Sequence, residues 1–406
     1  QCQVPCSPQC TPAEAGWRSN RGGAVTVADT ASPAHYCEGA AQLLLGPGFF
    51  RPQSRPSRDA GVLLTRWLTR ERPGRVLDVM AGCGIRALRY GLEGRAQEVW
   101  ANDADVDRLP LLQQNLQPLQ GRRLELSART AQHLLADCLM QQRRFDLLDL
   151  DAFGCPTALL PLALEALEFG GVLYLASTDG RSPTGHDRPA AIRSLGAAAR
   201  AHPSSWELAL RLQLAVVAKA AWAMGHGIRP LFSFSEGRTF RTAIQLRRRP
   251  EPREEEQLGL WAYCHRCAEQ SQQSLLRLRR WPACGCGDEP AGPLAISGPL
   301  WLGPLQDPLV LGELLQDAQA LPKESVAPAS RRLLEGLRAD AGLPVSCWPV
   351  DALAKRLGGG PPRLDALIDC LRAEGFAAQR SGVMSAQFRC NAPFSRVVEL
   401  ASALNR

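Results

Sequence analysis

The stretch RVLDVMAGCGIR, Arg75–Arg86, decides the fold. It opens with a short apolar run that ends at Asp78 and continues through small residues, Ala81–Gly84, into a segment with helical periodicity. A buried strand, a glycine-containing turn and a helix in this order let the backbone approach a ligand at the carboxyl end of the strand. We therefore expect a strand over 75–79 and a helix over 85–92.

The alternation of apolar runs with amphipathic segments continues to about residue 250. Strands that alternate with helices predict an α/β fold in which a parallel sheet carries helices on both faces. The last two apolar runs flank a turn at Gly237, which predicts a hairpin that closes the sheet with an antiparallel pair. The predicted strands cover 98–102, 124–128, 145–150, 171–177, 228–235 and 239–246, and the predicted helices cover 108–116 and 156–167.

An acid at the end of the second strand predicts a nucleoside ligand. Asp103 follows the glycine loop by about 20 residues, where a carboxylate accepts hydrogen bonds from ribose hydroxyls. Gly82 and Asp103 together suit either a dinucleotide or S-adenosyl-L-methionine. The loop lacks the third glycine of the dinucleotide pattern, which favours S-adenosyl-L-methionine. The alternative is a strand–turn–helix unit that binds no ligand.

The fourth predicted strand runs into Asp151-Ala152-Phe153-Gly154. Asp149 and Asp151 point to one face of this strand, and Asp151 falls at its carboxyl end, where open α/β sheets bind substrates. The run resembles the acid-Pro-Pro-aromatic signature of amino-group methyltransferases. Asp151 is predicted to accept a hydrogen bond from an exocyclic amine and orient its nitrogen, and Phe153 to stack on the base. Asp149 is interpreted as a structural residue. The alternative is that Asp149, and not Asp151, is the key acid.

Further segments match, in order, those of one family. The sequence resembles the tRNA (guanine(26)-N2)-dimethyltransferases, which belong to the class I S-adenosyl-L-methionine-dependent methyltransferases. The similarity covers residues 38–305 well and the remainder weakly. The matching segments are Glu38–Ala40, Phe49–Pro52, Ser57–Asp59, Gly84–Tyr90, Val99–Asp103, Asp149–Gly154, Ser177–Asp179, Glu207–Arg211 and Tyr263–Cys264.

The resemblance implies methyl transfer from S-adenosyl-L-methionine to the exocyclic N2 of a guanosine in tRNA, with position 26 as the expected site. The residues assigned to the cofactor are Arg58, Gly82, Arg86, Asp103 and Ala131. Arg58 suits the cofactor carboxylate because a guanidinium binds it bidentately. The chain departs from the family pattern at several positions, where Thr130 replaces an acid, Arg51 and Ser57 replace asparagines, and Ala152 replaces a proline.

The segment 258–303 contains two cysteine pairs. Cys264 and Cys267 form a Cys-x-x-Cys pair, and Cys284 and Cys286 form a Cys-x-Cys pair after 16 intervening residues. Four thiolates at such spacing predict a closed structural zinc site. His265 is an alternative ligand, and reduced thiols in a loop without metal are the other interpretation.

The chain divides into four predicted regions. Residues 1–35, rich in Pro, Gly, Ser and Cys, are expected to be disordered, and 36–250 form the methyltransferase domain. The cysteine segment follows, and 304–406 are expected to form a helical, winged-helix-like tRNA-binding domain with a short extended end. Its two predicted helices, 351–357 and 364–374, resemble a helix-turn-helix unit. The basic residues of this domain are Arg356, Arg363, Arg372 and Arg380. They are interpreted either as contacts to tRNA phosphates or as a solvated basic face.

Composition agrees with a nucleic-acid partner without requiring one. The 406 residues carry a formal net charge of +7. No run reaches about 18 apolar residues, so no membrane association is expected, and 14 cysteines used as thiols or metal ligands fit the cytoplasm. The oligomeric state stays open. The sequence is consistent with two other functions: an amino methyltransferase of another nucleic-acid base, and a tRNA-binding protein with a decayed active site. The acid lost at Thr130 favours decay, whereas the retained Asp103 and Asp151 argue against it.

Overall fold

The computed structural model describes residues 25–26, 34–282, 284, 286 and 294–405. The predicted N-terminal extension, 1–35, lies outside the described residues except for strand β1 (Val25–Thr26) and residues 34 and 35. β1 pairs with β4 (Phe49–Phe50), and β2 (His35–Glu38) forms a hairpin with β3 (Ala41–Leu44).

A seven-stranded sheet forms the centre of the molecule, in the order β10-β11-β9-β8-β5-β6-β7. The strands β7, β6, β5, β8 and β9 run parallel, and β11 runs antiparallel to both of its neighbours. This arrangement confirms the predicted class I methyltransferase sheet with its closing hairpin. The strands are β5 (Arg75–Asp78), β6 (Glu98–Asp103), β7 (Arg123–Ala128), β8 (Phe145–Ala152), β9 (Leu167–Ser177), β10 (Gly227–Glu236) and β11 (Thr239–Arg247).

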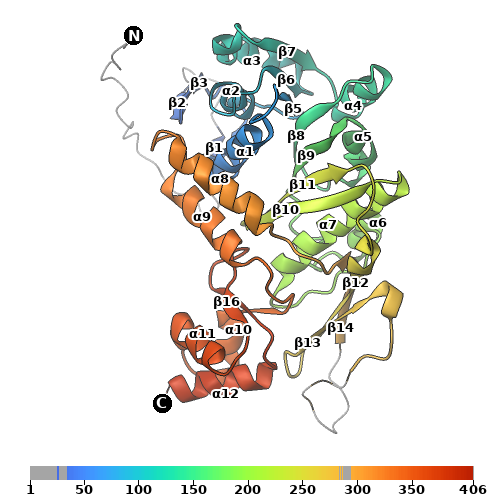
Figure 1. Ribbon diagram of the computed structural model, residues 1–406, viewed down its shortest axis with the longest axis vertical. Helices are drawn as coiled ribbons and strands as arrows, with labels where there is room; N and C mark the ends of the chain where they lie inside the picture. Colours follow the sequence, from blue (N-terminus) through green and yellow to red (C-terminus); the bar gives the residue numbers. More distant parts are fainter. Residues whose placement is uncertain (1–24, 27–33, 283, 285, 287–293, 406) are drawn as a thin grey trace.

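Helices cover both faces of this sheet (Figure 1). One face packs against α1 (Arg55–Leu68), α2 (Ile85–Leu92) and α3 (Leu109–Asn115), and the other against α4 (Ala131–Met140), α5 (Leu160–Glu165), α6 (Arg188–Leu195) and α7 (Ser205–Ala223). The chain leaves β5 toward β6 on one side and reaches β8 on the other. The strand order therefore reverses between β5 and β8, which is where open α/β sheets bind ligands.

Two helices from the segment 304–406 complete the first face. The helices α8 (Pro308–Ala320) and α9 (Pro328–Ala339) pack against α1 and bury their apolar side chains in the same core. Only the part of the segment beyond α9 forms a separate layer, the C-terminal module described next (Figure 1).

Two small sheets follow the central sheet in the chain. The cysteine segment forms a sheet of β12 (Leu258–Cys264), β13 (Gln270–Ser274) and β14 (Leu294–Trp301). The C-terminal module combines β15 (Cys347–Pro349), β16 (Ala378–Arg380) and β17 (Gln387–Cys390) with α10 (Val350–Leu357), α11 (Leu364–Ala373) and α12 (Phe394–Leu404).

The predicted helix pair, 351–357 and 364–374, is observed as α10 and α11. The expected extended end is wrong, because α12 lies at the end of the described residues. Its apolar residues Phe394, Val397 and Ala401 follow helical spacing and are buried in the core of the module.

A buried ion cluster joins the C-terminal module to helix α7 beside the central sheet. Arg389 of β17 lies 2.8 Å from Glu207 of α7 and 2.5 Å from Asp340. Arg211, one turn along α7, binds the same Glu207 at 2.8 Å. Burial alone would raise the pKa of Glu207, but the charges of Arg389 and Arg211 lower it. This cluster gives the Glu207–Arg211 segment, noted above only as part of a family resemblance, a structural role.

Candidate active site

A cavity of about 430 Å³ opens at the carboxyl ends of β5, β6 and β8. It brings together six of the seven residues predicted for cofactor binding and catalysis, which are Arg58, Gly82, Arg86, Asp103, Asp151 and Phe153. The seventh, Ala131, is buried at the start of α4 and does not line the cavity. The neighbouring Thr130 caps this helix by accepting a hydrogen bond from the His133 amide at 3.3 Å.

The glycine loop and the acid after β6 are joined directly. Gly82 has φ of 57°, a left-handed conformation that glycine adopts without strain. Its amide donates to Asp103 Oδ2 at 2.9 Å, and the Asp105 amide donates to Asp103 Oδ1 at 3.0 Å. Each carboxylate oxygen accepts a second hydrogen bond readily, so Asp103 is fixed at the cavity wall with acceptor capacity remaining.

Asp151 presents its two oxygens to different surroundings. Oδ2 accepts a hydrogen bond from Arg241 Nη2 at 2.7 Å and lies 3.2 Å from Arg86 Nη2. Oδ1 has no hydrogen-bond partner among the described residues, and the side chain, 29% exposed, lines the cavity. The geometry therefore leaves one carboxylate oxygen for a ligand.

The charge state of Asp151 is set by the two arginines. Burial alone would raise its pKa, but the positive charges of Arg241 and Arg86 lower the pKa to about 2. Asp151 is thus ionised at neutral pH. It can accept a hydrogen bond from an amine but holds no proton to donate.

Asp149 lies behind this pair and does not line the cavity. It is fully buried, its Oδ2 contacts Arg86 Nη1 at 3.3 Å, and the Tyr90 hydroxyl donates to the same oxygen. Burial raises the pKa of Asp149. This position agrees with the structural role predicted for Asp149 and leaves Asp151 as the acid that faces the cavity.

Arg58 has an acidic partner that the sequence did not indicate. Its Nε and Nη2 donate to the two carboxylate oxygens of Glu38 at 2.8 and 2.6 Å. Glu38 also binds the buried Arg89 at 2.7 Å, so the bidentate geometry expected for a cofactor carboxylate is already used within the protein. Arg58 still lines the cavity, where Nη1 donates to the Arg51 carbonyl at 3.0 Å.

Two exposed aromatic rings lie at the cavity. Phe153 is 76% exposed and Phe49 is 55% exposed, with ring centroids 6.1 Å apart in an edge-to-face arrangement. The Phe153 loop is fixed to the end of β9, because the Gly154 amide donates to Thr178 Oγ1 at 2.7 Å. Exposed rings at a cavity provide surfaces on which a base can stack.

Arg241 is a charged site residue absent from the predicted set. It belongs to β11 of the closing hairpin, lines the cavity and is buried. A buried arginine in a strand needs an acidic partner, which is the signal that could have identified it. The sequence alone does not reveal that the partner is Asp151, because the two lie 90 residues apart.

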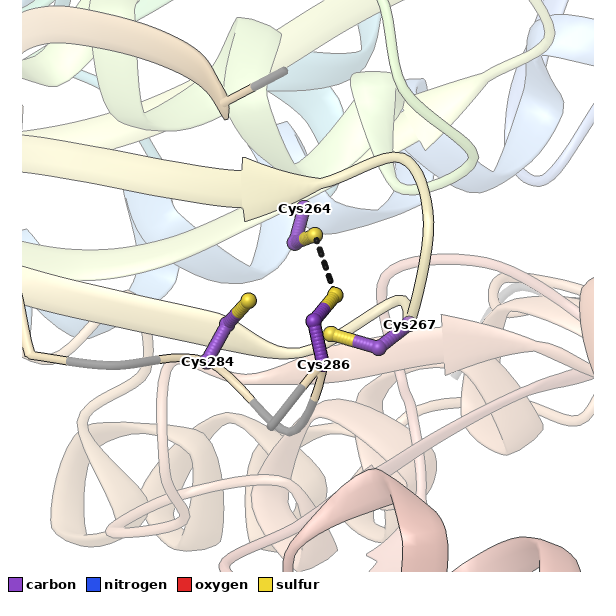
Figure 2. Close-up of side chains that lie close together, drawn as sticks. All are labelled: Cys264, Cys267, Cys284 and Cys286. Atoms are coloured by element: carbon purple, nitrogen blue, oxygen red, sulfur yellow. Dashed lines mark hydrogen bonds between the residues drawn. The ribbon is translucent and has the colours of Figure 1, made fainter. Parts of the chain in front are cut away.

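The four predicted zinc ligands converge (Figure 2). Cys264 ends β12, Cys267 follows in the turn, and Cys284 and Cys286 precede β14; their sulfur atoms all lie within 4.8 Å of one another. The Cys264 and Cys286 sulfurs are 3.6 Å apart. Tetrahedral zinc with 2.3 Å Zn–S bonds needs S···S distances of about 3.8 Å. The cluster is therefore compatible with a structural zinc ion, and His265 is not part of it.

Within the described residues, no helix is both long and apolar enough to span a lipid bilayer.

The comparison with known families decides the identity of the chain. The sequence profile of the N2,N2-dimethylguanosine tRNA methyltransferases matches residues 42–402. The chain belongs to this family. The resemblance predicted from the motifs is thereby confirmed, and so is the class of enzyme, a methyltransferase that depends on S-adenosyl-L-methionine.

Relatives in this family match along nearly their whole length. The tRNA (guanine(26)-N(2))-dimethyltransferase of Thermococcus kodakarensis is 30% identical over 89% of this chain and 97% of its own. The enzyme of the same name from Methanosphaerula palustris is 30% identical over 88% of this chain and 92% of its own. The structure of Trm1 from Pyrococcus horikoshii with S-adenosyl-L-methionine is 24% identical, with a TM-score of 0.76 over 90% of this chain and 99% of that chain, and shows the shared fold.

Proposed function

We propose that this chain transfers methyl groups from S-adenosyl-L-methionine to the exocyclic N2 of a guanosine in tRNA, at position 26. The observation that carries the proposal is the position and charge of the Asp151 carboxylate. Its carboxylate is ionised, one oxygen is held by Arg241 and Arg86, and the other faces a cavity that the glycine loop and Asp103 also line. An acceptor for an amine thus lies beside a predicted nucleoside site.

The residues around the cavity divide between cofactor and substrate. Asp103 and the Gly82 loop suit the ribose and the chain of S-adenosyl-L-methionine, which when bound supplies an electrophilic methyl group on sulfur. Arg58 donates to Glu38 through Nε and Nη2 and to the Arg51 carbonyl through Nη1, which leaves one N–H of Nη1 for the cofactor carboxylate. We therefore assign Arg58 to shaping this wall of the cavity. Ala131 stays a predicted cofactor-binding residue, although it does not line the cavity.

Asp151 performs the orienting step. Oδ1 accepts one N–H of the guanine amine, which turns the nitrogen lone pair away from the ring and toward the methyl donor. The N–C bond forms while the donor S–C bond breaks, and positive charge develops on the nitrogen next to the carboxylate, which stabilises it. The methylated nitrogen then loses one proton to solvent water, and S-adenosyl-L-homocysteine is left as the other product. After one transfer the nitrogen retains one N–H for Oδ1, so a second transfer uses the same contact.

The target base must leave its stack to reach this cavity, because N2 lies in the minor groove edge of a paired guanine. Phe153, with Phe49 beside it, offers the ring on which the displaced base stacks. The C-terminal module, held to the core by Arg389, is proposed to contact tRNA phosphates through its basic residues. The cytoplasm remains the expected location.

We also propose that Cys264, Cys267, Cys284 and Cys286 hold one structural zinc ion. Four protein thiolates leave no open position for water, so the ion would stabilise the segment and take no part in methyl transfer. Arg356 of α10 donates to the His265 carbonyl at 3.2 Å, which couples the turn that carries Cys264 and Cys267 to the C-terminal module.

The function is tested by changing the base at one position of the substrate. Transcripts that carry guanosine, inosine or adenosine at position 26 are incubated with the protein and isotope-labelled methyl donor. Inosine keeps the 6-oxo group and lacks only the 2-amino group. Transfer to the guanosine transcript and none to the inosine transcript supports the proposal. Equal labelling of all three contradicts the assigned position, and labelling of none, with the donor bound, supports a decayed site.

A further inference from the structure

We infer that Arg241 is a positioning residue for methyl transfer, which turns Asp151 Oδ2 into the protein and leaves Oδ1 for the substrate amine. The inference rests on the proposed function of Asp151. It assigns a role to a side chain on the closing hairpin, which carries none of the residues predicted to act in catalysis or cofactor binding.

The strand register brings the two residues together. Arg241 of β11 pairs with Ala176 of β9, and Ala176 pairs with Asp151 of β8. Residues paired across neighbouring strands place their side chains on the same face of the sheet. Arg241, Ala176 and Asp151 therefore form one row, and the methyl side chain in the middle leaves room for the guanidinium to extend over it to the carboxylate.

Arg241 is itself held rigidly. Its side chain is 3% exposed, Nε lies 3.3 Å from Glu236 Oε2, and the guanidinium lies 5.5 Å from the centroid of the Tyr174 ring. Tyr174 and Glu236 both bind the backbone of Ser57, at 2.8 and 3.3 Å. A guanidinium with its partners fixed on several sides imposes one orientation on the carboxylate that it binds.

Arg86 cannot replace this contact. Its guanidinium is shared among Asp151 at 3.2 Å, Asp149 at 3.3 Å and the Ser57 hydroxyl at 3.1 Å. Arg241 provides the shorter of the two contacts that the Asp151 carboxylate makes with arginines among the described residues, 2.7 Å against 3.2 Å for Arg86. Removal of Arg241 would leave Asp151 with one long contact and free to rotate.

The charges around Asp151 predict a measurable signature. Arg241, Arg86 and Arg58 lower the pKa of Asp151 against the effect of burial, whereas Asp149 and Asp78, on β8 and β5, carry like charge when ionised. An opposite charge this close lowers a carboxyl pKa by about 1–3 pH units. Without Arg241 the pKa of Asp151 rises, so Asp151 becomes protonated and activity is lost at a higher pH as the solution is acidified.

The test compares Arg241→Gln with Arg229→Gln. Arg229 lies on the neighbouring strand β10 and pairs with Asp307 at 2.5 Å, so it is a matched loss of one ion pair away from the cavity. Single-turnover methyl transfer is followed from pH 4 to 9. Arg241→Gln should lower the rate about 100-fold at pH 7.5, as when one preorganised polar contact is lost, and raise the acid limb by about 1–3 pH units from its wild-type position near pH 2. The wild type should therefore show no loss of activity due to Asp151 down to pH 4, whereas the variant should begin to lose activity at the acid end of the range. Arg229→Gln should change neither the rate nor the acid limb.

An unchanged rate and acid limb in Arg241→Gln overturns the inference. If that variant does not fold, Arg241→Lys replaces it: the retained charge should keep the acid limb in place while the loss of the planar fork lowers the rate about tenfold or more. A wild-type rate in Arg241→Lys also overturns the inference.

A further measurement separates this inference from the proposed function. Carboxyl ¹³C resonances of aspartate-labelled protein are titrated, with Asp151→Asn used to assign Asp151. The pKa of Asp151 should rise in Arg241→Gln whether or not the protein methylates tRNA. If the pKa of Asp151 does not rise in Arg241→Gln, the inference is contradicted even if the wild type is active. If the pKa rises but the wild type methylates no tRNA, Arg241 controls the charge of Asp151 and the proposed function fails.

Discussion

Substitution of Asp103 by alanine should weaken the binding of S-adenosyl-L-methionine. The carboxylate lines the cavity and is held by the Gly82 and Asp105 amides at 2.9 and 3.0 Å, so it is already oriented for a ribose hydroxyl. A hydrogen bond to a charged group contributes about 1.5–3 kcal/mol. Its loss corresponds to a dissociation constant about 10- to 150-fold larger.

Isothermal titration calorimetry with S-adenosyl-L-methionine measures this change without any need for tRNA. The matched control is Asp105→Ala, which removes an acid two residues away that does not line the cavity and pairs with Arg108 at 3.4 Å on the surface. Its dissociation constant should stay within about twofold of wild type, since exposed ion pairs contribute little. If Asp103→Ala binds the cofactor as tightly as the control, Asp103 does not hold the ribose and the cofactor lies elsewhere in the cavity.

Three further changes address catalysis, metal and assembly. Asp151→Ala should retain cofactor affinity and lower single-turnover methyl transfer about 10²-fold or more; near-normal transfer would refute its role. Wild-type protein purified without chelator should contain about one zinc per chain by metal analysis, and Cys264→Ser should lose zinc and melt earlier; a metal-free wild type would reduce the cluster to packed thiols. Arg389→Ala should lower the free energy of unfolding by about 3–5 kcal/mol in urea titrations, because it leaves the buried Asp340 without its partner and Glu207 with Arg211 alone; a loss below 1 kcal/mol contradicts the ion cluster as a structural joint.

Local patterns in the sequence predicted the catalytic core well. The helix expected over 85–92 is α2 with the same bounds, and the two runs around Gly237 form the β10–β11 hairpin. These elements are specified by short-range features: a glycine turn after a buried strand, helical periodicity, and two apolar runs close together in the chain. The cysteine spacing likewise predicted four thiols that the structure brings together.

Features that depend on tertiary pairing were not predictable in this way. The contact of Arg241 with Asp151 follows from the register of three strands, and that of Arg58 with Glu38 follows from how α1 packs beside a hairpin. Neither pair has a spacing that a helix or strand would reveal. The packing of α8 and α9 on α1 is also set by complementary apolar faces, which many helices share, so the sequence does not specify the partner.

The central claim is that an ionised Asp151 directs methyl transfer to the guanine amine of tRNA. Its most direct test is mass spectrometry of nucleosides from tRNA treated with trideuteromethyl-labelled S-adenosyl-L-methionine and either wild-type protein or Asp151→Asn. We predict label in N2-methylguanosine and N2,N2-dimethylguanosine with the wild type, and a loss of about 10²-fold or more with the variant. Label in any other methylated nucleoside, or equal label in N2-methylguanosine from both proteins, would contradict the account.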